Sequence, residues 1–337
     1  MGVLTQADEI SQIAFGYMGS KALFAALESD VFTLLADGPK AAADLAEKTA
    51  LEPDRAEMLL TALAGLGLVT VEDGKFANSP AAEAFLVKGA KYDFSDYLRL
   101  QVGKQMYPLL DQIEAALENR LPENATSSYA DWFSDPEQAR LYSESQHAGS
   151  LGPARQLARK TDLSDAKTML DVGGGTGAFA ITLCQANPDL HATVVDYPNV
   201  AALGQKYVEE ANLADRITYV PGDGREDIWP KNQDIVLMSY LFSGVPGEAH
   251  EALIKRAYDH LAPGGRLMIH DFIVDEDRTG PKLAALWQLQ HTAFTPEARS
   301  LDTGWLQEAL TRNGFEDVEI GTMIPEMTML ASGRRPA

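Results

Sequence analysis

The chain has 337 residues, enough for two domains with a sizeable core, and its hydrophobic content of 45% is ordinary for a globular protein. It carries 49 acidic against 28 basic residues, a formal net charge of −21, which argues against nucleic acids and anionic membrane surfaces as partners. The single cysteine, Cys184, excludes an intramolecular disulfide. Because neither a signal sequence nor a membrane-spanning apolar stretch is apparent, we expect a soluble, cytoplasmic protein.

The first part of the chain predicts three helices and a hairpin. Apolar residues recur at helical spacing over residues 8–36, and two shorter helices are expected over 41–49 and 54–66. Two short strands, 68–71 and 75–76, then flank an Asp-Gly pair, which is typical of a hairpin turn. This order is a winged-helix arrangement.

A winged helix often binds DNA, but the charges here oppose that function. Residues 53–63, the expected recognition helix, contain two acidic residues and one basic residue. Helices that read a DNA groove are basic. We therefore favour an interaction module over a ligand-sensing transcription regulator.

Residues 93–160 read as helical, with prolines marking the expected helix boundaries. One helix is predicted to begin with Asp135 as its N-cap and Pro136 in its first turn. Further along it, Tyr142 and Gln146 are four residues apart and share a face, with His147 beside them.

Residues 167–177 are the most informative stretch for function. A short apolar strand ends in Asp171 and Val172, and the chain then enters a run containing Gly173, Gly175 and Gly177. A helical segment, residues 178–186, follows. Glycine allows a tight turn and a close ligand approach, so this order predicts the first half of a nucleotide-binding βαβ unit.

From this point strands and helices alternate to the end of the chain. Strands are expected near 168–172, 192–196, 217–220, 234–239, 266–271, 315–320 and 327–331, and helices near 199–211, 247–262, 282–293 and 302–312. The pattern predicts an α/β fold with a doubly wound sheet. Ligands of such sheets bind outside the carboxyl ends of the strands.

Three carboxylates are expected at that edge of the sheet. Asp171 precedes the glycine turn, Asp196 ends the second strand, and Asp223 follows the third. A cationic sulfonium suits such a rim, whereas the pyrophosphate of NAD would be repelled. The glycine pattern alone also fits an NAD-dependent oxidoreductase, which this charge argument disfavours.

The order of these motifs resembles that of class I S-adenosyl-L-methionine (SAM) methyltransferases. With the N-terminal module included, nearly the whole chain is similar to the plant-type and bacterial small-molecule O-methyltransferases, in which a winged-helix domain forms an intertwined homodimer. The resemblance implies a dimerisation domain over 1–105, a helical linker lining the acceptor pocket over 106–160, and a Rossmann-like SAM-binding catalytic domain over 161–337.

The resemblance also implies which residues bind SAM and its product, S-adenosyl-L-homocysteine. The glycines and Asp171 would hold the methionine end, Asp196 the ribose hydroxyls and Asp223 the adenine. The full predicted set is Asp171, Gly173, Gly175, Gly177, Asp196, Gly222, Asp223 and Ser239.

The customary base of this family is missing. Relatives carry a histidine after the fourth strand, which deprotonates the acceptor hydroxyl, and a partner glutamate at the end of the fifth. Here Phe242 and Asp271 stand at those positions. Either another histidine has taken over, or the acceptor needs no deprotonation, as with a thioether sulfur or an electron-rich carbon.

The resemblance places the acceptor against the pocket helix and the strand ends. Glutamine replaces the methionine that relatives carry at position 146, which suggests a more polar acceptor. The candidates for acceptor binding are Tyr142, Gln146, His147, Phe242, His250, Trp287 and His291, of which His291 is less favoured, as is the further histidine His270, with Phe294 as apolar wall. Those for catalysis are Tyr142, His147, His250 and Asp271. No cluster has metal-ligand spacing, so we expect no metal.

Within the family, the altered loop, the acidic composition and Gln146 look most like bacterial methylthiohydroxybutyrate S-methyltransferases, the enzymes of dimethylsulfoniopropionate (DMSP) biosynthesis. That resemblance implies S-methylation of the thioether of 4-methylthio-2-hydroxybutyrate by in-line positioning, without a general base. The alternative is O-methylation of a phenolic or hydroxylated small molecule with a relocated histidine as base.

Overall fold

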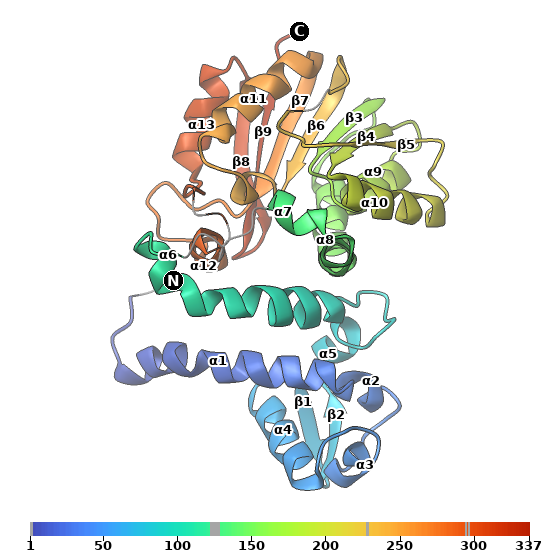
Figure 1. Cartoon of the computed structure of the whole chain (residues 1–337), viewed down its shortest axis with the longest axis vertical. Coiled ribbons are helices and arrows are strands. Elements are labelled where there is room, and N and C mark those ends of the chain that lie inside the picture. Colours follow the sequence, from blue (N-terminus) through green and yellow to red (C-terminus); the bar gives the residue numbers. More distant parts are fainter. Residues whose placement is uncertain (1–2, 122–128, 227–228, 294, 296) are drawn as a thin grey trace. The chain divides into compact units, whose positions relative to one another are not determined.

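The computed structural model describes residues 3–121, 129–226, 229–293, 295 and 297–337, the side chain of Asp131 excepted (Figure 1). The chain divides into two compact units, one ending at Tyr107 and the other spanning Pro108–Ala337. The segment expected as a separate linker, 106–160, thus falls almost entirely in the second unit. In the described part of the chain, no helix combines the length and apolar character needed to cross a bilayer.

The N-terminal unit is a small helical domain with a two-stranded hairpin. It contains α1 (Ala7–Glu28), α2 (Val31–Leu35), α3 (Ala42–Ala46), α4 (Pro53–Gly65), β1 (Val69–Glu72), β2 (Lys75–Asn78), α5 (Pro80–Phe85) and η1 (Tyr97–Met106). Phe32, Leu45, Leu60 and Leu63 lie in its core. The predicted winged-helix order is present.

The single helix predicted over residues 8–36 is in fact two. Asp30 adopts a left-handed backbone conformation, with φ of 55°, between the end of α1 and the start of α2. Periodicity continues across this break because residues on both sides face the same core, so the apolar pattern alone did not reveal it.

The second unit is built on a seven-stranded sheet with the order β5-β4-β3-β6-β7-β9-β8. The strands are β3 (Thr168–Val172), β4 (His191–Asp196), β5 (Ile217–Pro221), β6 (Gln233–Ser239), β7 (Leu261–Asp271), β8 (Glu316–Ile324) and β9 (Thr328–Arg334). All neighbours are parallel except β9, which is antiparallel to both β7 and β8. The predicted doubly wound α/β class is confirmed.

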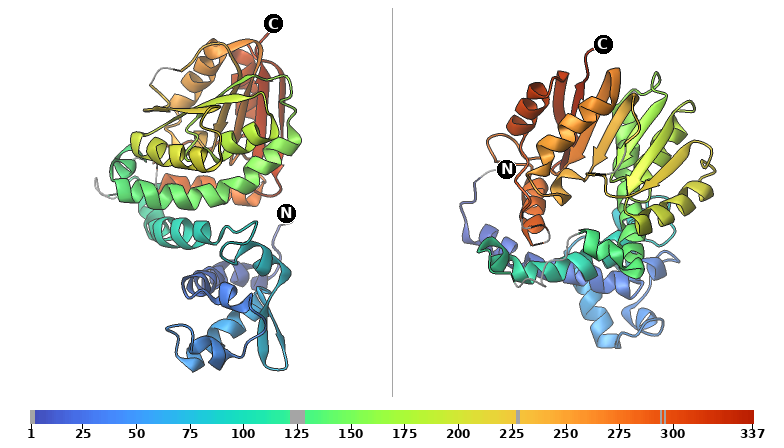
Figure 2. Two further views of the ribbon diagram at one scale, coloured as in Figure 1. Left: turned by 90° about the vertical axis from the view of Figure 1, so that its right-hand side faces the viewer. Right: turned by 45° about the horizontal axis from the view of Figure 1, so that its top comes forward.

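Helices cover both faces of this sheet (Figure 2). They are α8 (Pro136–Lys160), α9 (Ala178–Ala186), α10 (Pro198–Glu210), α11 (Ala249–His260), α12 (Lys282–Thr292) and α13 (Thr303–Arg312), preceded by the short segments η2 (Tyr107–Gln112), α6 (Ile113–Leu117) and α7 (Tyr129–Ser134). One further turn, η3 (Phe242–Gly244), follows β6.

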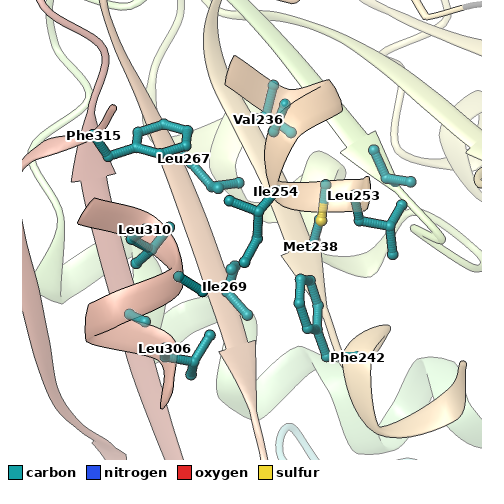
Figure 3. Close-up of a cluster of buried hydrophobic side chains, with 14 of the residues drawn as sticks. Val236, Met238, Phe242, Leu253, Ile254, Leu267, Ile269, Leu306, Leu310 and Phe315 are labelled. Atoms are coloured by element: carbon teal, nitrogen blue, oxygen red, sulfur yellow. The ribbon is translucent and has the colours of Figure 1, made fainter. Parts of the chain in front are cut away.

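Alternate residues along the central strands build a separate core on each face. Leu170, Val236 and Ile269 belong to the cluster under α11 and α13, part of which is drawn in Figure 3. Their neighbours Met169 and Leu237 belong to the cluster under α8, α9 and α10. Burial on both faces explains why these strands are continuously apolar, and it fixes their carboxyl ends at one edge.

The helix α1 leaves large apolar side chains in water, among them a stripe formed by Ile10, Ile13 and Tyr17. Ile10 and Ile13 are 60% and 65% exposed, and Phe15, Tyr17 and Met18 are all more than half exposed. Side chains of this size gain free energy when a partner covers them. This exposure agrees with the expectation of a homodimer formed through the N-terminal domain.

We expect Ile13→Glu to shift the protein from dimer to monomer, because a charge would be buried in the covered stripe. Light scattering coupled to gel filtration measures this. Gln12→Glu, which adds the same charge at an exposed polar position of α1, is the matched control and should remain dimeric. A monomeric wild-type protein, or an Ile13→Glu variant that dimerises normally, would contradict the expectation.

Candidate cofactor and acceptor site

The turn after β3 has a backbone that only glycines follow without strain. Gly173, Gly175 and Gly177 have φ of +67°, +58° and +77°. A Cβ at Gly174 would lie 2.7 Å from the Asp171 carboxylate and 2.6 Å from Val194 Cγ1. The turn therefore presents bare backbone to the edge of the sheet, as a close-fitting ligand requires.

Tyr219 of β5 supports this turn through its side chain. Its hydroxyl donates a hydrogen bond of 3.1 Å to the carbonyl oxygen of Gly175. The ring fits against α10 only because residue 204 is glycine, where a Cβ would lie 2.1 Å from the hydroxyl oxygen. Sequence reasoning missed Tyr219, since a tyrosine in a strand has no distinguishing pattern.

Asp171 is a buried carboxylate without a counterpart. It is 1% exposed, and neither of its carboxylate oxygens has a hydrogen-bond partner in the described structure. Burial, with a contribution from the negative charge of Asp196, raises the pKa of Asp171 to about 7. An unpaired buried charge is costly, so this position favours a ligand that brings a positive group.

Asp196 ties the end of β4 to the glycine turn. Its carboxylate accepts hydrogen bonds of 2.7 Å from the backbone N–H of Gly175 and of 2.7 Å from that of Tyr197. Burial raises the pKa of Asp196 to about 6, against the lowering effect of these two donors. Asp196 thus fixes the shape of the turn as well as facing the cavity.

Asp223 is neutralised by a residue that sequence reasoning missed. Arg225 Nη2 lies 2.6 Å from Asp223 Oδ2, and Arg225 Nε lies 3.1 Å from both carboxylate oxygens. Burial alone would raise the pKa of Asp223, but the hydrogen bonds from Arg225 outweigh it and hold the pKa below its ordinary value. A lone arginine two residues beyond an aspartate gave no signal in the sequence.

These groups surround a cavity of about 400 Å³. Gly177 does not line it and instead caps the start of α9. The other residues predicted to bind the cofactor all lie on its wall: Asp171, Gly173, Gly175, Asp196, Gly222, Asp223 and Ser239.

The cavity continues from the glycine turn to an aromatic wall. Tyr142 packs its ring 5.1 Å from that of Phe133 and 6.0 Å from that of Tyr129, centroid to centroid, and all three line the cavity. Gln146 lies on the same wall, one helical turn from Tyr142. Tyr129 and Phe133, from α7, were not predicted, although their spacing of four residues places them on one helix face.

None of the predicted histidines lies on the wall of this cavity as the structure describes it. His147 turns to Thr176, with Nδ1 2.7 Å from the hydroxyl oxygen, and stacks on Tyr207 at 4.0 Å. Burial lowers its pKa to about 4. The placement differs from the prediction because position 147, one residue past Gln146, is rotated toward α10.

The two histidines nearest the strand ends are held inside the protein. His250 is 2% exposed and donates from Nε2 to the carbonyl oxygen of Phe242 at 2.8 Å; burial lowers its pKa. His270 lies between the hydroxyls of Ser239 and Thr328, at 2.8 and 2.9 Å, and burial lowers its pKa to about 3. Both act as structural links between elements.

Phe242 and Asp271 also differ from their predicted positions on the acceptor wall. The Phe242 ring points into the hydrophobic cluster beside Met238 (Figure 3) and is fully buried. Asp271 accepts hydrogen bonds from the backbone N–H of Ser243 and Phe272, at 3.0 and 2.8 Å, and burial raises its pKa. Asp271 therefore anchors η3 to the end of β7.

The remaining acceptor candidates come from α12 and the segment after it. Trp287 stacks on Phe272 at 4.6 Å and does not reach the wall of the cavity. His291 is 4% exposed and lines a different cavity. Phe294 lies outside the described residues. Among the residues that are described, no group of three or more His, Cys, Asp or Glu side chains could hold a metal ion.

The parallel sheet, the glycine cradle and the unpaired Asp171 carboxylate define a site that fits the cationic amino-acid end of SAM. The dimerisation-domain model of the O-methyltransferases matches residues 11–88, and their O-methyltransferase domain model matches residues 124–316, more than half of the chain. The chain belongs to this O-methyltransferase family. It is a SAM-dependent methyltransferase, and SAM supplies the methyl group that it transfers.

Relatives cover nearly all of the chain. It is 30% identical to the tetracenomycin polyketide synthesis 8-O-methyl transferase TcmO of Streptomyces glaucescens, over 97% of this chain and 96% of that one. It is 31% identical to the 3-hydroxy-5-methyl-1-naphthoate 3-O-methyltransferase of Streptomyces sahachiroi, over 89% and 88%. Human N-acetylserotonin methyltransferase, solved with SAM, has the same fold, with a TM-score of 0.85, 23% identity and complete coverage of both chains.

Asp171→Asn should have opposite effects on stability and binding. A carboxyl whose folded pKa is about 7 destabilises the ligand-free fold above pH 7, and this penalty shrinks as the pH falls from 7 toward about 4, the unfolded value. We expect the variant to be more stable than wild type at pH 8, on the order of 2 kcal/mol, with the difference fading by pH 4.5.

The same variant should bind SAM at least about tenfold more weakly, because the cation loses its partner. Denaturant unfolding and calorimetry measure the two effects. Asp223→Asn removes a carboxylate that is already paired, so it should not stabilise the protein at pH 8. Loss of stability in Asp171→Asn at every pH would contradict the account.

Tyr219→Phe should loosen the glycine turn and weaken SAM binding about threefold to tenfold, the usual worth of one hydrogen bond. Tyr258→Phe removes the hydroxyl of a tyrosine that packs on Phe315 and does not line the cavity, and it serves as the control in the same calorimetric titration. Equal affinities for Tyr219→Phe and wild type would show that the hydroxyl does not support the turn.

Proposed function

We propose that this protein methylates a hydroxyl group of a small aromatic or hydroxylated molecule, with SAM as donor. The observation that carries this is the aromatic wall of Tyr129, Phe133 and Tyr142, which shares one cavity with the glycine turn. Flat rings pack favourably against such side chains. The relatives named for a polyketide and a naphthoate hydroxyl support this acceptor class.

O-methylation must also remove the proton of the hydroxyl, and the structure does not favour a histidine as the base that takes it. His147, His250, His270 and His291 all lie off the described cavity wall. We therefore propose an acidic hydroxyl, such as a phenol, that ionises without an imidazole. The protein then contributes orientation, which can lower a barrier as effectively as a general base.

Tyr142 and Gln146 would orient the acceptor in this proposal. They lie on one face of α8 and on the wall of the cavity, and the side-chain oxygen of Gln146 has no hydrogen-bond partner in the described structure, so it can accept from a polar group of the acceptor. Glu297 is an exposed carboxylate on the same wall and is the remaining group to test for proton uptake.

A second candidate is S-methylation of a thioether, as in 4-methylthio-2-hydroxybutyrate and DMSP synthesis. The observation in its favour is the same lack of a described histidine on the wall, since a thioether sulfur has no proton to lose. Neither of the two relatives named above is named for a sulfur acceptor, so we place it second.

Methyl transfer from labelled SAM to a panel of acceptors tests both candidates. The panel contains four compounds. Two are aromatic hydroxyls, 1-naphthol and a second phenol whose pKa is lower than that of 1-naphthol. The other two are 4-methylthio-2-hydroxybutyrate and its sulfur-free analogue 2-hydroxyhexanoate. We expect methyl ethers from the aromatic hydroxyls, with a rate that rises with pH around each acceptor's own pKa. Glu297→Gln should leave that profile in place.

The products separate the candidates, because a sulfonium is permanently cationic and a methyl ether is not. A pH-independent reaction confined to the thioether would replace the first candidate with the second. A pH profile that follows the enzyme rather than the acceptor, and is lost in Glu297→Gln, would show that the protein supplies a base after all.

A further inference from the structure

A second cavity, of about 280 Å³, adjoins η3. Gly244 of η3 lines the cofactor and acceptor cavity, whereas Ser243 lines this one. The rest of its wall comes from Phe272, Val274 and Arg278, which follow β7, from α12 and from residues 298–301. The methyl-transfer site does not use it.

The described wall of this second cavity carries positive charge only. Its charged side chains are Arg278 and Arg299, and no carboxylate lines it. Arg278 is paired with Asp302 at 2.8 Å, whereas Arg299 has no ion pair with any described residue. Within the described residues, an arginine without an ion pair, beside a cavity that no carboxylate lines, contrasts with the acidic composition of a chain whose net charge is −21.

The fold holds Arg299 in place through Gly247. The backbone N–H of Gly247 donates to the carbonyl oxygen of Glu297 at 3.0 Å. A Cβ at Gly247 would lie 2.2 Å from Arg299 Cγ, so the stem of the arginine rests against bare backbone. The residue as a whole is exposed, so its stem is packed while its guanidinium remains accessible to a ligand.

After Arg299, His291 is the second side chain of this cavity that indicates a ligand. It is 4% exposed, it lines the cavity, and neither ring nitrogen has a hydrogen-bond partner in the described structure. A neutral imidazole has one N–H donor and one acceptor, and leaving both unpaired in the interior is costly. An oxygen atom in the cavity would satisfy the donor.

We propose that this second cavity is a binding site for a small organic carboxylate, which pairs with the guanidinium of Arg299 and accepts a hydrogen bond from His291. A guanidinium matches the two oxygens of a carboxylate in one plane. Val274, Leu289 and Leu301 give the cavity apolar walls, which suit a short aliphatic tail better than the fully charged surface of phosphate. The proposal does not depend on the identity of the methyl acceptor.

Calorimetry with butyrate and with inorganic phosphate tests the site in the full chain saturated with S-adenosylhomocysteine. We expect one butyrate per chain, no phosphate binding at the same concentration, and a loss of affinity of at least about tenfold in Arg299→Gln. Arg159→Gln removes an exposed arginine of α8 elsewhere, and Gln146→Ala alters only the first cavity. Both should bind butyrate as wild type does.

Two outcomes of the titration would overturn the proposal outright: no butyrate binding in wild type, or equal weakening in Arg299→Gln and Arg159→Gln. Weakening in Gln146→Ala but not in Arg299→Gln would place the butyrate in the first cavity and also overturn it. Phosphate binding in place of butyrate would reject the carboxylate class.

Nitrogen-15 spectra of the imidazoles provide a readout on the wild-type protein, so the result does not depend on whether a variant folds. Butyrate should shift the ring resonances of His291 and leave those of His191, an exposed histidine of β4, unchanged. Unchanged His291 resonances at saturating butyrate would reject its part in the site.

Discussion

The site depends on one constraint, the burial of an unpaired carboxylate at the end of a central strand. Asp171 cannot move away from the sheet, because its neighbours Leu170 and Val172 are locked in the core. Its charge is uncompensated until a cation arrives. We propose that the stability given up in the ligand-free protein is recovered as affinity for SAM, and that Asp171 also fixes the direction of the bound donor.

Around Asp171, several polar side chains hold the loops of the site in shape. Asp196 and Tyr219 hold the glycine turn through its N–H and carbonyl groups, and Asp271 and His250 hold η3 in the same way. Asp271 and His250, which the sequence suggested for catalysis, instead support this loop in the structure. Under the proposed function, the acceptor is oriented against the aromatic wall of Tyr129, Phe133 and Tyr142.

The sequence was sufficient for the parts that depend on local pattern. Alternation and turn glycines predicted the sheet, and strand ends predicted Asp171, Asp196 and Asp223 at one edge. It was insufficient where packing decides which way a side chain points. His147 and Gln146 are adjacent, yet only Gln146 reaches the cavity, and Phe242 is buried in a cluster that also contains side chains of α11 and α13.

The ion pair between Asp223 and Arg225 has a consequence for turnover. It cancels the charge at one end of the crevice, so attraction for positive groups is concentrated near Asp171. If Asp171 attracts the donor as proposed, spent donor keeps its amino group but has lost its sulfonium charge, and is held there less strongly than fresh donor. The unequal ends of the crevice thus favour exchange of used for unused donor after each cycle.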